Sequence, residues 1–274
     1  MMKSGLKDAT LKLNYSAMNI VEISWINLLL GYTMLIIPFS MMIYFNTKLL
    51  KPTIIAVVRM TIQLFLVGLY LKYLFKLDNE FVNILWVLAM IVIATITNVR
   101  KSKLRFRLFF LPISMALLAS VIIVIPFFLK LTVQLDNIFT ARYFIPITGM
   151  VIGNCMERNI MALNSYYQSL TREQLEFRYY IANGATLKEA TLPHIKNALN
   201  AAFNPLIAQM TVIGLVSLPG TMTGQILGGS SPDTAIKYQI LLMLSIFIAT
   251  MITVVLTLLF SNKLIFDEND GLRR

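Results

Sequence analysis

Cysteine and histidine are almost absent from this chain of 274 residues, which has one of each, Cys155 and His194. A single cysteine excludes an intrachain disulfide, and we interpret Cys155 as a small packing residue. The histidine lies in a polar segment, so we do not expect a buried metal site around it. No other residues have the spacing of a known metal site, and any metal ligands stay unknown.

The common catalytic motifs are also missing. The sequence has no phosphate-binding Walker A loop, no HExxH helix, no paired-cysteine metal site and no GxSxG turn. We therefore expect no enzyme activity of its own and no cofactor bound by this chain. If the protein moves a solute, the energy must come from a partner or from an ion gradient.

Charged residues are scarce, at 14% of the chain, whereas 57% of the residues are hydrophobic and the mean hydropathy is +0.73. This composition is typical of an integral membrane protein. A helix of about 17 to 25 apolar residues crosses the hydrocarbon core. The sequence predicts an all-α polytopic bundle of about seven such spans in one transmembrane domain over 1–274. The spans are 25–45, 54–75, 81–99, 108–129, 144–163, 199–218 and 236–260.

The segment before Trp25 has no compact apolar core, so no cleavable signal peptide is expected.

Basic residues outnumber acidic ones, 24 to 13, and their positions predict the orientation. With the N-terminus outside, most of the basic residues fall on the cytoplasmic side, which favours an N-out, C-in topology. The polar insert 164–197 is then cytoplasmic. We interpret the basic run Arg100–Arg107 as a topology determinant that also contacts anionic membrane lipid, and we expect no nucleic-acid binding.

Helix caps divide the insert 164–197. Thr171 and Gln174 have capping-box spacing, which predicts a helix start at Thr171. One face of this helix carries Leu175, Tyr179 and Ala182. Gly184 is expected to end it, because glycine readily adopts the left-handed conformation just past a helix.

A second capping box follows at once. Thr186 and Glu189 have the same spacing, which predicts a new helix within three residues of the first. Pro193 is expected to limit this second helix to about two turns.

Small residues mark possible close contacts or a gate. Gly220, Gly224 and Gly228 recur every fourth residue, and Gly149 and Gly153 form a similar pair. Such spacing lets a neighbouring backbone approach closely. The segment from Ile213 to Thr234 is either a broken, re-entrant stretch or an ordinary loop with one tight helix contact, and the sequence leaves both open.

Polar residues within spans are candidates for a solute pathway. Arg59 and Gln63 are four residues apart and share one helix face, although Arg59 is close enough to the cytoplasmic end to snorkel. Asn154 and Gln225 are further candidates. A soft-metal path along methionines is a weaker alternative to core packing; its members would be Met150, Met156, Met161 and Met222.

Several motifs together resemble one family. The insert reads Glu176 and then IANGATLKEATLPHI, which is similar to the coupling loop of ABC transporter permeases. The stretches VRMTIQLFLVG (58–68), IPITGMVIGNCM (145–156) and GLVSLPGTMTGQILGG (214–229) resemble the FetB-type permeases, a family with bacterial iron export permeases and plant aluminium-tolerance relatives. The likeness covers nearly the whole chain beyond its N-terminal segment.

This resemblance implies a permease domain in the cell membrane, homodimeric and paired with a separate FetA-like ATPase that binds ATP and Mg. It implies export of a metal ion, iron, driven by that ATPase. A nucleotide sugar or another small solute is the alternative cargo, and a scaffold or sensor for a cytoplasmic partner is the alternative function. The residues that would contact the ATPase are Glu176, Gly184, Ala185, Thr186, Glu189 and Leu192.

Overall fold

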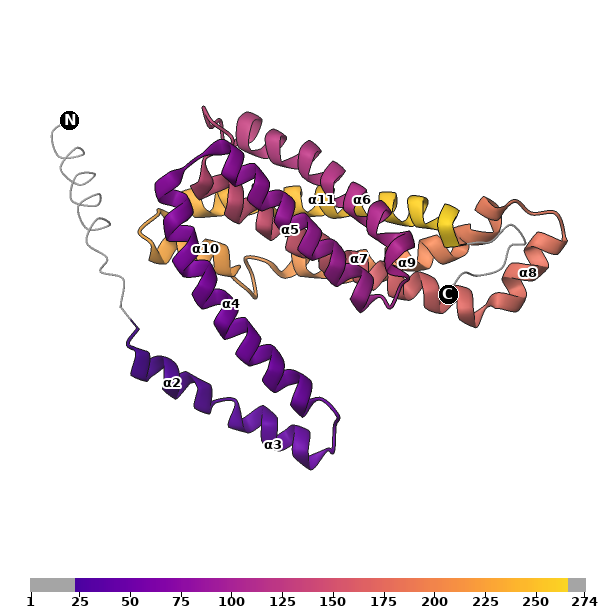
Figure 1. Cartoon of the computed structure of the whole chain (residues 1–274), viewed down its shortest axis with the longest axis horizontal. Helices are drawn as coiled ribbons and strands as arrows, with labels where there is room; N and C mark the ends of the chain where they lie inside the picture. The colour runs from indigo at the N-terminus through magenta and orange to yellow at the C-terminus, as the bar shows by residue number, and fades with distance from the viewer. Residues whose placement is uncertain (1–22, 266–274) are drawn as a thin grey trace. The chain divides into compact units, whose positions relative to one another are not determined.

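Helices make up nearly all of the chain. A computed structural model describes residues 23–265, with side chains described to residue 262. The helices are α2 (Trp25–Thr33), α3 (Ile36–Tyr44), α4 (Leu50–Leu77), α5 (Glu80–Lys101), α6 (Phe106–Pro126), the π-helix η1 (Phe127–Thr132), α7 (Ala141–Arg172), α8 (Gln174–Ala182), α9 (Leu187–Val212), α10 (Gly220–Leu227) and α11 (Pro232–Ile265). These residues contain no strand, which confirms the all-α expectation (Figure 1). The expectation about a signal peptide concerns residues 1–22, outside this range.

The chain forms two compact units. The first includes the described residues up to Leu77 together with Gly224–Ser231, and the second includes Asp78–Thr223 and the residues from Pro232 onward. The expectation of one transmembrane domain over 1–274 stays a prediction, because a membrane bundle can contain more than one compact unit.

The first unit is a helical hairpin with little interior. Trp25 of α2 contacts Phe65 of α4, their ring centroids 6.1 Å apart, and the Tyr32 hydroxyl hydrogen-bonds the Thr61 hydroxyl. Among the residues of α2, α3 and α4, only Leu74 is buried. Their apolar side chains therefore face lipid or another protein chain.

The second unit holds the core. In it α11 packs against α6 and α7, and α7 also packs against α5 and α9. Small and β-branched residues such as Ala116, Val151 and Ala249 are fully buried where these helices meet. Cys155 is buried as well, with its Sγ 3.8 Å from the Thr250 hydroxyl, as expected of a packing residue.

Five helical segments are long and apolar enough to cross a membrane: Trp25–Tyr44, Leu50–Leu77, Glu80–Lys101, Phe106–Thr132 and Pro232–Asn262. They confirm a multi-pass membrane protein. The predicted spans 144–163 and 199–218 are not among them, because α7 carries Glu157 and Arg158 and because the helix of the second one ends at Val212. The count of seven and the N-out orientation stay predictions.

The predicted helix start at Thr171 is wrong. Helix α7 continues to Arg172, because Tyr166 and Leu170 are buried and keep its last turns packed. The break comes at Glu173, and α8 begins without a side-chain cap.

The predicted end at Pro193 is also wrong. Helix α9 runs through Pro193 and Pro205 to Val212. Proline inside a helix costs about 3 kcal/mol. Burial of Ala198, Ala202 and Phe203 beyond it offsets that cost. The predicted coupling segment and the residues beyond Pro193 are therefore one continuous helix.

The glycine-rich segment consists of two turns with a short helix between them. A tight turn with Gly214 at φ +88° follows α9, then the eight-residue α10, then a turn with Gly229 at φ +92°. Whether this stretch re-enters the membrane depends on where the bilayer lies, and both alternatives stay predictions.

Candidate functional site at the polar end of the second unit

Helix α8 is fixed at one end of the second unit by a single buried anchor and a sharp turn (Figure 1). Phe177 is the one buried residue of α8. After α8, Gly184 adopts φ +84°, which confirms the predicted left-handed position, and α9 begins three residues later. The turn leaves the rest of α8 free to face outward.

The exposed side of α8 carries large apolar side chains beside the charged Glu176 and Arg178. Leu175 is 86% exposed and Tyr179 is 67% exposed, one helical turn apart, and Tyr180 beside them is also exposed. We call these three residues the α8 patch. Leu192 of α9 is a further exposed apolar residue at this end. Large exposed apolar groups outside the membrane spans are characteristic of protein contact surfaces.

A polar cluster joins α7 to α9 behind α8. The Ser169 hydroxyl lies 2.6 Å from Nδ1 of His194, and a carboxylate oxygen of Glu173 lies 3.5 Å from the same nitrogen. Burial lowers the pKa of His194, and the carboxylates of Glu173 and Glu176 oppose this only in part. The imidazole is therefore neutral at pH 7 and serves as a structural link.

A second network joins three helices just beneath the first. The Tyr166 hydroxyl donates to Asn262 Oδ1 at 2.8 Å, and Asn262 Nδ2 donates to the Thr191 hydroxyl at 3.1 Å. These residues belong to α7, α11 and α9, and all are buried. A displacement of the first turns of α9 is thereby transmitted to α7 and α11.

The second capping box is confirmed. The Thr186 hydroxyl accepts from the Glu189 amide, and the Glu189 carboxylate accepts from the Thr186 amide at 2.8 Å. The hydrogen bonds that the carboxylate accepts from the Thr186 amide and from the Thr186 hydroxyl lower the pKa of Glu189. Its carboxylate is thus committed to the helix start.

The six predicted coupling residues all lie in α8, the turn and the first turns of α9. Glu176 is exposed and accepts a hydrogen bond from Tyr180 at 3.4 Å. Gly184, Ala185 and Thr186 form the turn. Their contact with an ATPase stays a prediction.

The predicted glycine contacts are met only in part. A Cβ on Gly149 would lie 2.7 Å from Met90 of α5, so α5 and α7 approach closely there. Nothing lies within 4 Å of such an atom on Gly153, Gly220 or Gly224, and Gly228 meets only backbone of its own segment. These four positions have no close helix neighbour among the described residues, and their role as a gate stays a prediction.

The predicted pathway residues do not gather at one site. Arg59 and Gln63 line a shallow depression of about 490 Å³ on α4, in the first unit. Asn154 Nδ2 donates to the Met150 carbonyl of its own helix at 2.9 Å, in the second unit. Gln225 is half-buried on α10.

Arg158 and Glu157 are adjacent charged residues on α7. The two side chains approach only to 3.9 Å, and Glu157 is largely exposed while Arg158 is buried. Its Nε has no hydrogen-bond partner among the described residues. This pair is therefore a weak ion pair.

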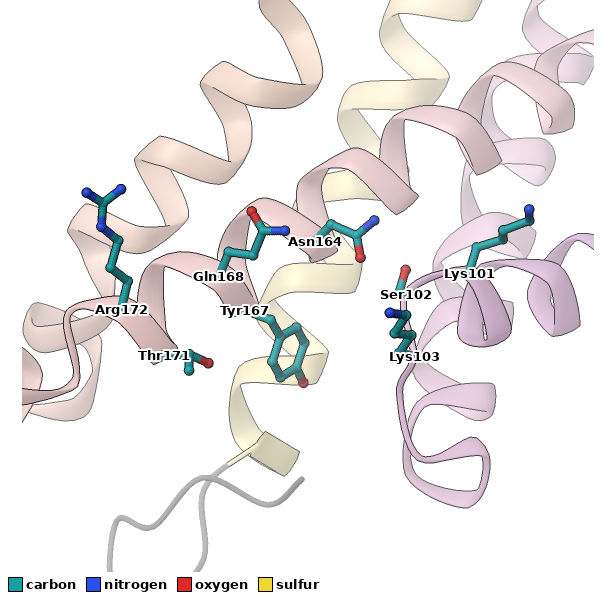
Figure 2. Close-up of a pocket in the computed structure, with 8 residues that line it drawn as sticks. All are labelled: Lys101, Ser102, Lys103, Asn164, Tyr167, Gln168, Thr171 and Arg172. Carbon is teal, nitrogen blue, oxygen red and sulfur yellow. The ribbon is translucent and has the colours of Figure 1, made fainter. Parts of the chain in front are cut away.

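A basic pocket is the feature that sequence reasoning did not identify as a site (Figure 2). It has a volume of about 640 Å³ and is lined by residues of α5, the α5–α6 turn and α7, including Lys101, Lys103 and Arg172. The run Arg100–Arg107 was the available signal, but nothing in the sequence placed Arg172 beside it.

Metal-ligating side chains do not gather in the described part of the chain. Within residues 23–262, no group of three or more histidine, cysteine, aspartate or glutamate side chains could hold a metal ion.

Comparison with known proteins identifies the family. Residues 25–266 match UPF0014, an uncharacterised protein family. The chain is 30% identical to the UPF0014 membrane protein YjkA of Bacillus subtilis, over 84% of this chain and 90% of that protein. It is 33% identical to Protein ALUMINUM SENSITIVE 3 of Arabidopsis thaliana, over 72% and 71% of the two chains. No solved structure matches.

A further relative bears directly on the expected activity. The chain is 32% identical to the probable iron export permease protein FetB of Escherichia coli, over 70% of this chain and 72% of that protein. The resemblance to FetB-type permeases is thereby confirmed. The chain belongs to the UPF0014 family of multi-pass membrane proteins.

Proposed function

We propose that this protein is the membrane-spanning subunit of an ABC transporter that exports a metal ion, iron, using ATP hydrolysed by a separate ATPase. The observation that supports it most is the α8 patch. Leu175 and Tyr179 are apolar, exposed and held outside the membrane spans. An apolar surface of this kind needs a protein partner, and the chain has no nucleotide-binding motif of its own.

The connections behind the patch suit a mechanical role. Force on α8 reaches α9 through the turn at Gly184, and α9 continues without interruption into the membrane region. The two polar networks, at His194 and at Asn262, join α9 to α7 and α11. A partner that moves α8 would therefore move three long helices together.

Iron as the cargo rests on the relative named as a probable iron export permease. Cysteine and histidine, two common ligands of iron, occur once each in this chain, so cargo ligands would be shared between copies or supplied by backbone and amide groups. Gln63 on α4 is the candidate for such a shared surface in a homodimer, because its amide oxygen can ligate a cation, whereas the neighbouring Arg59 guanidinium cannot.

The coupling proposal is tested by the double variant Leu175→Ser and Tyr179→Ser, co-expressed with a FetA-like ATPase. Removing two exposed apolar side chains is expected to weaken association with the ATPase at least about tenfold, because contact hot spots each contribute about 1–2 kcal/mol or more. Copurification and binding measured by surface plasmon resonance provide the readout. Leu215→Ser with Val216→Ser is the matched control, because these residues are equally exposed but follow the far end of α9.

Association that is equal in the two double variants would refute the assignment of the α8 patch. Transport is then measured in vesicles containing both subunits, with ferrous iron and a nucleotide sugar as alternative cargo. ATP-dependent movement of the sugar alone would overturn iron but leave the coupling proposal intact. Movement of neither cargo by a complex that hydrolyses ATP would overturn both assignments of cargo.

A further inference from the structure

The basic pocket at the polar end has two parts that share a wall. The larger, about 640 Å³, lies between the end of α5 and the last turns of α7. The smaller, about 270 Å³, reaches Arg105 at the start of α6. Ser102, Lys103 and Tyr167 line both. Figure 2 shows that the lining comes from the α5–α6 turn on one side and from α7 on the other.

The charge of this pocket is of one sign. Lys101, Lys103, Arg105 and Arg172 line it, and no acidic residue does. None of these four cations forms an ion pair with a residue in the described part of the chain. Four cations around one depression, without an ion pair to any described residue, favour an anion there.

Two hydroxyl groups of the wall have no partner. Ser102 is only 7% exposed, and its Oγ is buried without a hydrogen bond to any described residue. The Tyr167 hydroxyl is buried and unpartnered in the same way. Burial raises the pKa of Tyr167 well above its usual value, so this hydroxyl stays a donor. A buried polar group without a partner costs about 1–3 kcal/mol, which a ligand would recover.

Backbone groups near the pocket also favour an anion. Three of the last four carbonyls of α5, those of Asn98, Val99 and Arg100, are satisfied, since the amides of Ser102, Lys103 and Leu104 bond back to them. Helix α6 begins at Phe106 with no side-chain cap on its first amides. Free amides at a helix N-terminus attract an anion, whereas the capped end of α5 adds little opposing field.

We propose that this pocket binds a phosphate group, supplied by the headgroup of an anionic phospholipid. The cations would neutralise the phosphate, and Ser102 and Tyr167 would donate to its oxygens. A lipid is the favoured source because the pocket adjoins apolar membrane helices, and Phe106 beside it is exposed. A basic pocket between membrane helices is a known form of headgroup site. The bound lipid would hold the α5–α6 turn against the end of α7, directly before α8. This inference does not depend on an ATPase.

The test is binding of a phosphatidylglycerol lipid, with phosphatidylcholine as reference, to the purified full chain, measured by native mass spectrometry. The triple variant Lys101→Gln, Lys103→Gln and Arg172→Gln is expected to bind the anionic lipid at least about tenfold more weakly than the unaltered chain. The matched control Lys48→Gln, Lys51→Gln and Lys196→Gln removes three exposed cations that lie outside the pocket. It is expected to change binding less than about threefold.

A second variant tests whether specific hydrogen bonds, and not only surface charge, hold the lipid. Ser102→Ala with Tyr167→Phe keeps every cation and removes only the two hydroxyls. It is expected to weaken anionic lipid binding by about threefold to tenfold. Equal binding by this variant and the unaltered chain, or equal loss in the two triple variants, would overturn the proposal. The melting temperature of each variant shows whether it is folded.

Inorganic phosphate distinguishes the two sources of the anion. If lipid binding persists when phosphate is added, the headgroup is the ligand, as proposed. If phosphate alone binds the detergent-purified chain, depends on the pocket residues and displaces the lipid, the site takes free phosphate and the lipid assignment is overturned.

Discussion

His194 illustrates how a single residue acquires a role from its surroundings. In sequence it is one polar residue in a polar insert. In the folded chain it is buried between α7 and α9, in contact with Ser169 and near the Glu173 carboxylate. Protonation would place a charge in a buried position, so the folded state resists it.

The pH dependence of stability follows from this. Since the pKa of His194 is lowered on folding, the unfolded chain takes up the proton first as the pH falls. The His194 contribution is therefore complete above the ordinary histidine pKa of about 6.5 and declines below it. We expect the melting temperature to fall between about pH 7.5 and about pH 5.5. The fall should be smaller in His194→Gln, and an identical pH profile for the two proteins would contradict this.

Ser102 also gets its role from its surroundings, but unlike His194 it has no hydrogen-bond partner for its side chain among the described residues. Its hydroxyl is buried without a hydrogen bond to any described residue, and the packing of α5 against α7 creates that situation. An unpaired polar group in a packed region indicates a missing ligand or water.

At the scale of elements, the turn between α8 and α9 sets the position of the α8 patch. Gly184 provides the left-handed residue and Thr186 provides the cap. Both operate locally, which explains why the sequence predicted them correctly. The orientation of α8 depends on them together with the buried Phe177.

Gly184→Val is expected to destabilise this turn by about 1–2 kcal/mol or more, because a β-branched residue is strained at positive φ. Nothing lies within 4 Å of the added Cβ, so backbone strain is the cause. The measurement is protease cleavage within the insert under native conditions, which should accelerate. Gly153→Ala, a helical glycine with equally open surroundings, is the control and should leave the cleavage rate unchanged.

For the molecule as a whole, burial is distributed unevenly. The second unit has a packed interior, whereas α2, α3 and α4 bury almost nothing. One face of α4 contacts α2 through Phe65 and Thr61. Arg59 and Gln63 lie on a different face, and polar groups in a membrane helix rarely face lipid.

If this polar face of α4 meets a second copy, cysteines on it should be cross-linked. In a Cys155→Ala background, Gln63→Cys is expected to form covalent dimers in membranes with a short bismaleimide. Leu64→Cys is the control, since it is exposed but rotated by about 100° around the helix. Equal or absent cross-linking at both positions would argue against an α4 interface.

The sequence predicted the class of the protein and its local breaks. The length of the apolar runs predicted the membrane helices, and the predictions of the Thr186–Glu189 cap and of a left-handed Gly184 were correct. Errors arose where packing overrode a local signal. Pro193 does not stop α9, because Ala198 and Ala202 are buried beyond it, and the Thr171 cap is lost inside a helix held by Leu170.

Contacts between residues far apart in the chain decided the remainder. Composition and short-range propensity are properties of neighbouring residues, so the sequence alone determined an all-α membrane protein with a polar, turn-broken insert. It could not place Arg172 beside Lys103, pair His194 with Ser169, or leave Leu175 exposed. These features arise only when α5, α7, α8 and α9 pack together, because side-chain burial and charge proximity are set by tertiary structure.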